Sequence, residues 1–176
     1  NVWKRTALSS NFFTFGIERY LTAPDHTAIA AAAWNSPYDI MYVIVNTEKY
    51  GGGGIYNFYG LSMSDHKNEK EVLVHELGHA FAGLADEYYQ SAVTYEEFYK
   101  LSLEPWEPNI TTQVDFKSKW ADMMGRDSVG LYEGGGYMAK GIFRPRSDCK
   151  MKSNASPSFC PVCVRAINRM IDYYTK

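Results

Sequence analysis

The feature that most constrains the fold is the stretch NEKEVLVHELGHAFAGL at residues 68–84, which predicts one amphipathic helix. Asn68 suits a helix N-cap, and Glu71 follows three residues later, as in a capping box. Gly83 stands where helices commonly end on a left-handed residue. Five apolar residues recur at helical spacing and are expected to face the core: Leu73, Leu77, Ala80, Phe81 and Leu84.

Two histidines on this predicted helix indicate a metal site. His75 and His79 are four residues apart, so their side chains lie side by side on a face separate from the apolar stripe. This HExxH spacing lets two imidazoles bind one zinc ion, with Glu76 directed toward the metal-bound water. Zinc lowers the pKa of that water from about 15.7 to about 7. Glu76 is therefore predicted to act as general base and later as proton donor.

A catalytic zinc usually has three protein ligands, so one more residue must complete the site. We predict Asp86, because Gly83 permits a sharp reversal after the helix and a short side chain suits a ligand on a tight turn. The other candidates are the neighbouring Glu87, a more distant Glu96 or Glu97, and His66 before the helix. Asp86 is preferred over Glu87, for which the alternative role is to support a ligand or form a salt bridge.

The composition bounds the class of protein. A chain of 176 residues fits one domain with a substantial core. A net charge of -2 gives no basic field for nucleic acid, and no apolar run is long enough to span a membrane.

Periodicity gives a coarse outline of the remaining elements. The small-residue run in 23–34 predicts a buried helix capped by Asp25 or Thr27, and 40–46 predicts a central strand. The glycines at 51–54 indicate a mobile loop or a close backbone approach, and 55–63 an edge strand. The remaining predicted elements are short helices in 94–104 and 114–125, a hairpin in 129–145 and a final helix in 160–176.

Three cysteines, Cys149, Cys160 and Cys163, cluster near the end of the chain. The CPVC pair suits a redox pair, half of a zinc site or one end of a disulfide. A structural zinc site takes four ligands, and the only further ligand nearby in sequence is Asp148. We therefore expect a disulfide from Cys149 to one member of the pair, which suits an oxidising compartment.

Several segments together resemble the igalysin family of metzincin-like zinc peptidases, named for an immunoglobulin A peptidase. They are YGGGGIYN, HELGHAFAGLADEYY, EPWEPNIT, GGGYMAKGIFRP, DCKMKSN and FCPVC. The resemblance implies a zinc-dependent endopeptidase, secreted or in the bacterial cell envelope, that acts on protein or peptide substrates such as immunoglobulin A. Asp86 stands three residues after Gly83, as the metzincin ligand does after its glycine. Here, however, the glycine follows His79 by four residues rather than three, and the ligand is acidic.

The resemblance also implies an α+β, metzincin-like catalytic domain over 1–176. A twisted mixed sheet and the active-site helix would form an upper subdomain, 1–83, above the cleft. An irregular lower subdomain, 84–176, would end in a helix. Met151 is the candidate for a methionine-containing turn beneath the metal, with Met138 as its rival and Tyr137 facing the cleft. The family implies N-terminal strands before the first residue, so we expect this chain to be truncated there.

Two further expectations concern the substrate. The strand in 55–63 would align an extended substrate by backbone pairing, with the preceding glycines allowing close approach. The segment 134–140 would set specificity by its position. The alternative function is a secreted binding module that keeps the metal for structure without turnover. An intact Glu76 argues against it, because a structural zinc needs no general base.

Overall fold

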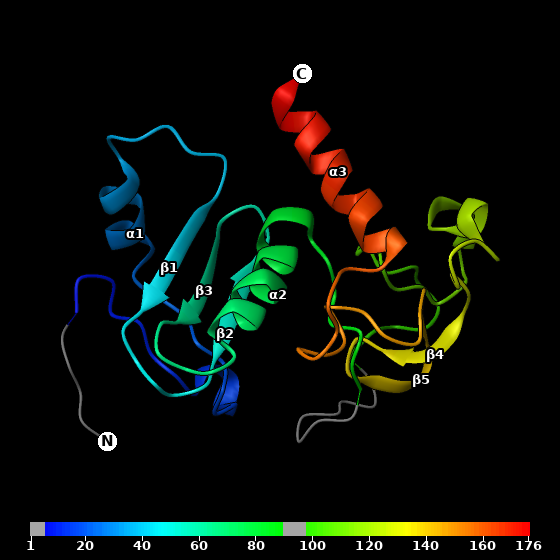
Figure 1. The fold of residues 1–176 in the computed structure, drawn as a ribbon, viewed down its shortest axis with the longest axis horizontal. Coiled ribbons are helices and arrows are strands. Elements are labelled where there is room, and N and C mark those ends of the chain that lie inside the picture. The colour runs from blue at the N-terminus through cyan, green and yellow to red at the C-terminus, as the bar shows by residue number, and fades with distance from the viewer. Residues whose placement is uncertain (1–5, 90–97) are drawn as a thin grey trace. The chain divides into compact units, whose positions relative to one another are not determined.

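The computed structural model of the protein describes residues 6–89 and 98–176. Its described residues form two compact units, Asn1–Ala80 and Phe81–Lys176. The first contains η1 (Thr14–Gly16), α1 (His26–Ala33), β1 (Met41–Val45), β2 (Gly52–Ile55), β3 (Tyr59–Met63) and most of α2 (Glu69–Ala82) (Figure 1). This α+β composition agrees with the predicted fold class. Among the described residues, no helix combines the length and apolarity that crossing a membrane requires.

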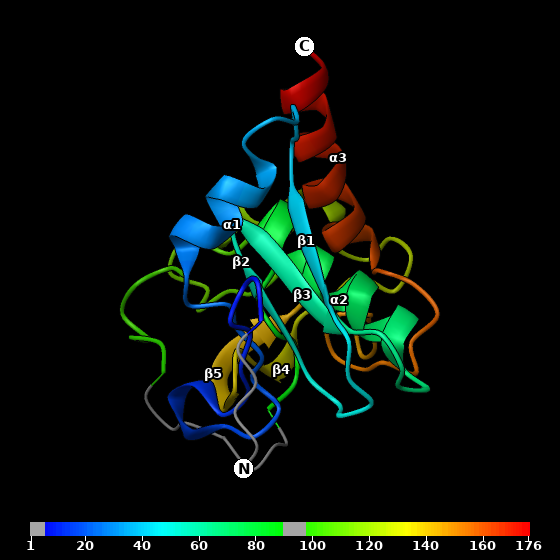
Figure 2. The same cartoon turned by 90° about the vertical axis from the view of Figure 1, so that its left-hand side faces the viewer.

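A mixed three-stranded sheet organises the first unit, in the order β1–β3–β2 (Figure 2). β3 pairs in parallel with β1 and antiparallel with β2, and all five of its residues are buried. The prediction of a central strand in 40–46 and an edge strand in 55–63 was therefore wrong. Asn57, at φ 57°, turns the chain inside the second segment and splits it between β2 and β3. Because β3 is hydrogen-bonded on both sides, it cannot align a substrate strand.

The sheet lies between α1 and α2 (Figure 1). Tyr59 and Leu61 of β3 pack on Ile29 of α1, whereas the alternate β3 residues point to the opposite face. The Asp25 side chain caps α1 by accepting a hydrogen bond from the Ala28 backbone N–H at 2.9 Å, as predicted. The expectation of a buried α1 was wrong, because Ile29 is its only buried residue; its alanines add little apolar surface to the sheet.

Glycines on the α2-facing side of the sheet allow the helix to approach closely. A Cβ at Gly52 would lie 2.5 Å from Glu76 Oε1, and a Cβ at Gly54 would lie 2.6 Å from both the Glu76 backbone oxygen and His79 Cβ. Real Cβ atoms do not make such contacts. Residues 52–54 of this glycine run therefore belong to β2 rather than to a mobile loop, and the backbone that comes close to them is that of α2.

Replacing Gly54 with alanine is expected to destabilise the protein by about 1–3 kcal/mol, because the added methyl would push α2 off β2. The free energy of unfolding from chemical denaturation measures this. Gly135→Ala is the matched control, since a Cβ there would meet its nearest neighbours at 3.6 Å. Equal stability of Gly54→Ala and the parent would contradict the packing described here.

α2 begins and ends as the sequence predicts. The Asn68 carbonyl accepts the Val72 N–H at 3.0 Å, and Gly83, at φ 62°, follows the last helical residue. The predicted apolar stripe was only partly correct. Ala80 and Leu84 are buried, but Leu73, Leu77 and Phe81 are half-buried. The glycine-lined sheet decides this, because it draws the helix face carrying Val72 and Glu76 toward β2.

The second unit has little regular structure. It contains the hairpin β4 (Tyr132–Gly135) and β5 (Met138–Arg144) and the C-terminal α3 (Pro161–Thr175), both as predicted (Figure 1). The predicted helix in 114–125 is instead two 3-10 turns, η2 (Phe116–Ser118) and η3 (Ala121–Met123). The predicted helix in 94–104 lies partly outside the described residues, and its described part is not helical. The main core of this unit gathers Trp120, Met151 and the cysteines against α3.

Candidate metal centre

The two histidines of the HExxH motif converge in the first unit. His75 and His79 lie on successive turns of α2, and their Nε2 atoms are 3.1 Å apart. Two Zn–N bonds of about 2.0–2.1 Å at a tetrahedral angle would separate the nitrogens by about 3.3 Å. The two imidazole rings lie edge to face, with their planes inclined at 82°. The donor type and the separation therefore both fit a zinc ion.

Glu76 lies between these histidines in sequence and contacts the sheet. Its carboxylate oxygen Oε1 occupies the space that a side chain at Gly52 would fill. Tyr42 is a neighbour on the same face of the sheet, and its hydroxyl donates to the Leu73 carbonyl at 3.1 Å. Burial raises the pKa of Tyr42, and the charge of Glu76 raises it further. Tyr42 therefore stays a neutral phenol beside the predicted base.

Asp86, the predicted third ligand, lies in the second unit. Its side chain is buried and accepts a hydrogen bond from the Tyr137 hydroxyl, while its backbone oxygen accepts the Gly136 N–H at 2.7 Å. Tyr137, at φ 66°, sits at the β4–β5 turn and donates its own N–H to the Tyr88 carbonyl at 3.1 Å. The loop after Gly83 is thus tied to the hairpin. No pattern in the sequence predicted this hydrogen bond between Tyr137 and Asp86.

The side chain of the adjacent Glu87 has other partners. It has no exposed surface, and its Oε1 accepts hydrogen bonds from Asn109 Nδ2 at 3.0 Å and Cys163 Sγ at 3.3 Å. Burial raises the pKa of Glu87 well above its usual value. The Asn109 side chain also accepts a hydrogen bond from the Ala85 backbone N–H and donates one to the Ala85 carbonyl. Asp86 and Glu87 therefore have different surroundings.

The remaining candidate ligands are His66, Glu96 and Glu97. His66 lies at the start of α2, where its Nδ1 accepts the Asn68 N–H at 3.1 Å. Glu96 and Glu97 lie outside the described residues.

The two methionine candidates are both buried in the second unit. Met151 has no exposed surface, and its carbonyl accepts the Glu87 N–H at 2.8 Å. Met138 belongs to a separate small core with Ile110, and its sulfur accepts the Tyr99 N–H at 3.3 Å. Met151 is therefore hydrogen-bonded to the loop after α2. Its position beneath a metal ion stays a prediction.

The cysteines depart from the sequence-based expectation. All three are free and buried, and the sulfurs of Cys149 and Cys163 are 3.7 Å apart. The predicted disulfide was therefore wrong. Asp148 is exposed, whereas Glu87 lies against the thiols. The position of Glu87 beside the thiols was not predicted, because Glu87 is distant from the cysteines in the sequence.

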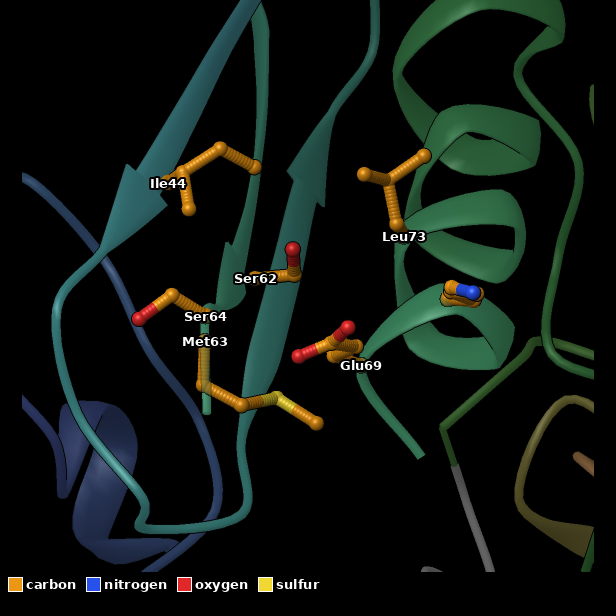
Figure 3. A pocket seen from close by; sticks show the side chains of 7 residues that line it. Ile44, Ser62, Met63, Ser64, Glu69 and Leu73 are labelled. Carbon is orange, nitrogen blue, oxygen red and sulfur yellow. The ribbon is translucent and has the colours of Figure 1, made fainter. Parts of the chain in front are cut away.

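A pocket in the first unit lies apart from the HExxH residues (Figure 3). It opens between β1, β3 and the start of α2, and its lining residues are Ile44, Ser62, Met63, Ser64, Glu69, Lys70 and Leu73. Its surface is largely apolar and offers a single carboxylate, so it does not provide a metal-ligand set.

Comparison with known families agrees with the chemistry of the motif. The family model described as IgA Peptidase M64 matches residues 1–128 and 125–171, which together span nearly the whole chain. No curated protein matches the sequence. The matched segments include the complete HExxH helix, the loop with Asp86 and the cysteine-rich end. The chain therefore belongs to the IgA Peptidase M64 family of metallopeptidases.

Proposed function

We propose that the protein is a zinc-dependent endopeptidase that hydrolyses peptide bonds with Glu76 as general base. One observation carries this proposal: the Nε2 atoms of His75 and His79 converge at 3.1 Å on a helix that places Glu76 between them. Membership of a metallopeptidase family supports the assignment. The two imidazoles match the nitrogen ligands that zinc takes in hydrolytic sites.

Asp86 is proposed as the third ligand. A buried carboxylate is stable when it is hydrogen-bonded or bound to a cation, and the Tyr137 hydroxyl supplies one hydrogen bond to it. Gly83 provides the left-handed residue that reverses the chain after α2. The adjacent Glu87 is engaged with Asn109 and the thiols, which leaves Asp86 as the acid of this pair for the catalytic metal.

Each residue of the proposed site has a separate role in peptide-bond hydrolysis. When bound, zinc supplies a Lewis acid that acidifies water and polarises the scissile carbonyl. Glu76 accepts the proton of the attacking water and delivers it to the nitrogen of the leaving amine. His75 and His79 provide neutral imidazole nitrogens, and the Tyr137 hydroxyl fixes the orientation of the Asp86 carboxylate.

We also propose that the protein is secreted or located in the bacterial cell envelope and that its substrate is a protein or peptide. Immunoglobulin A, named in the family description, is the first glycoprotein to test. A metal-stabilised binding module without turnover is the weaker alternative, because a purely structural zinc has no use for Glu76 between its histidines.

Cleavage of casein and of a proteome-derived peptide library tests this function. We expect new peptide termini in both, complete loss of cleavage after treatment with a chelator, and recovery when zinc is restored. The cleavage sites in the library would give the sequence preference. Undiminished cleavage by protein that elemental analysis finds free of metal would contradict the proposal.

A further inference from the structure

A second group of possible metal ligands lies entirely within the second unit. Glu87, Cys149, Cys160 and Cys163 each offer one ligand atom, and these atoms all lie within 4.8 Å of one another. Each of the four residues is at most 1% exposed. They come from three segments: the loop after α2, the turn that contains Met151, and the start of α3. The fold therefore collects in its core four groups that are dispersed in sequence.

The spacing within this group, which we call the Cys3Glu cluster, matches tetrahedral zinc. Zn–S bonds of about 2.3 Å place two sulfurs about 3.8 Å apart, and the Cys149 and Cys163 sulfurs are 3.7 Å apart. The Glu87 carboxylate adjoins these sulfurs, since its Oε1 lies 3.3 Å from Cys163 Sγ. The spacing of the two sulfurs therefore fits a tetrahedral zinc ion, with the carboxylate beside them.

Glu87 provides a second, independent observation. Its Oε2 is buried and has no hydrogen-bond partner among the described residues. A carboxylate oxygen without a partner in a dry core is costly, and a coordinated cation removes that cost. The other oxygen, Oε1, accepts a hydrogen bond from Asn109 Nδ2 at 3.0 Å. Such a bond orients a carboxylate toward a metal in the way that outer partners orient ligands.

We propose that Glu87, Cys149, Cys160 and Cys163 bind a structural zinc ion that is separate from the catalytic one. Three thiolates and one carboxylate make a closed set of four ligands, as structural zinc sites have, with no position left for water. Thiolate ligands select zinc over the hard cations that prefer oxygen.

This ion would cross-link three segments of a unit that has little regular structure. Glu87 directly follows Asp86, and its backbone N–H donates a hydrogen bond to the Met151 carbonyl. A zinc ion bound to Glu87 would therefore also fix the loop that carries Asp86, the proposed catalytic ligand. Neither histidine of the HExxH motif belongs to the Cys3Glu cluster, so zinc binding there does not depend on the proposed peptidase activity.

Metal analysis of the full chain, loaded with zinc alone, tests the stoichiometry. We expect about two zinc ions per chain, falling to about one in a His75→Ala/His79→Ala double variant. Loading with Co²⁺ instead should give the near-ultraviolet charge-transfer band of thiolate–cobalt bonds. The double variant should keep that band in full, because only the Cys3Glu cluster contains thiolates.

Two single variants test the ligands. Cys163→Ser and Glu87→Gln should each lower the zinc content by about one ion per chain, and Cys163→Ser should also weaken the thiolate–cobalt band. Ala166→Ser is the matched control for the first, since it adds a hydroxyl at a buried position of the same helix. Glu107→Gln is the control for the second, because Glu107 is another buried carboxylate of this unit. Both controls should retain the parental zinc content.

Three results would overturn the second site. The first is a folded parent that binds zinc only through the histidines, without a thiolate–cobalt band. The second is mass spectrometry that finds a disulfide among the three cysteines of the zinc-loaded protein. The third is an unchanged zinc content in folded Cys163→Ser and Glu87→Gln. A missing histidine-dependent zinc with an intact thiolate–cobalt band would instead count against the catalytic metal alone, so the two proposals fail separately.

Discussion

Glu76→Gln is expected to lower kcat by about 10²–10⁴-fold while the zinc content stays at the parental level. Glutamine has nearly the shape of glutamate, so the packing of this side chain against Gly52 is preserved. It cannot accept the proton of the attacking water, however, and the proton-transfer contribution is lost. Steady-state cleavage of a peptide from the library, together with metal analysis of the same preparation, measures both quantities.

Glu71→Gln is the matched control for this variant. Glu71 lies in the first turn of the same helix, and glutamine retains its capacity for a capping hydrogen bond. Its kcat and zinc content should equal those of the parent. If Glu76→Gln cleaves as fast as the parent, the general-base mechanism is wrong, and Glu76 does not accept the proton of the attacking water.

Asp86→Asn is expected to reduce the affinity of the histidine site for zinc by more than about 100-fold and to abolish cleavage at limiting zinc. That loss exceeds the 10–100-fold typical of a residue that only orients a ligand, which is the effect expected for Tyr137→Phe. Competition with a chelator of known affinity measures the change. The thiolate–cobalt band of the Cys3Glu cluster should persist, because Glu87 and the cysteines are unchanged.

Asp148→Asn is the control, since Asp148 is an exposed acid of the same unit. It should retain both zinc ions and full activity. Parental zinc affinity and kcat/KM in Asp86→Asn would remove Asp86 from the ligand set. Loss of the metal in a Glu96 or Glu97 variant instead would favour a more distant ligand.

Local signals predicted the elements that depend on neighbouring residues. α2 was predicted with its start at Asn68 and its end before Gly83, because a cap and a left-handed glycine act within one turn. The hairpin β4–β5 and the helix α3 were also predicted from local patterns. The order of the strands in the sheet was not predicted from local patterns, because it depends on pairing between segments that are distant in the chain. The apolar run of β1 indicated a central strand, yet β3, which has the same length, lies at the centre because it pairs with a strand on each side.

The glycines of β2 show how one residue type can serve two structures. In sequence, the run at 51–54 is equally compatible with a mobile loop and with close packing. In the fold, Glu76 and His79 lie where side chains at Gly52 and Gly54 would stand. Only the presence of α2 against the strand distinguishes the two interpretations, and that contact is between segments separated in the chain.

The sequence by itself determined the histidine pair and the base between them, because a helical repeat places residues i and i+4 together wherever the helix lies. It also determined family membership, through motifs that span most of the chain. Only the tertiary structure decided what the two adjacent acids do. It directs Asp86 to Tyr137 and Glu87 to Cys163, a partner 76 residues away. No local periodicity encodes such a pairing, because packing of the irregular second unit brings these segments together.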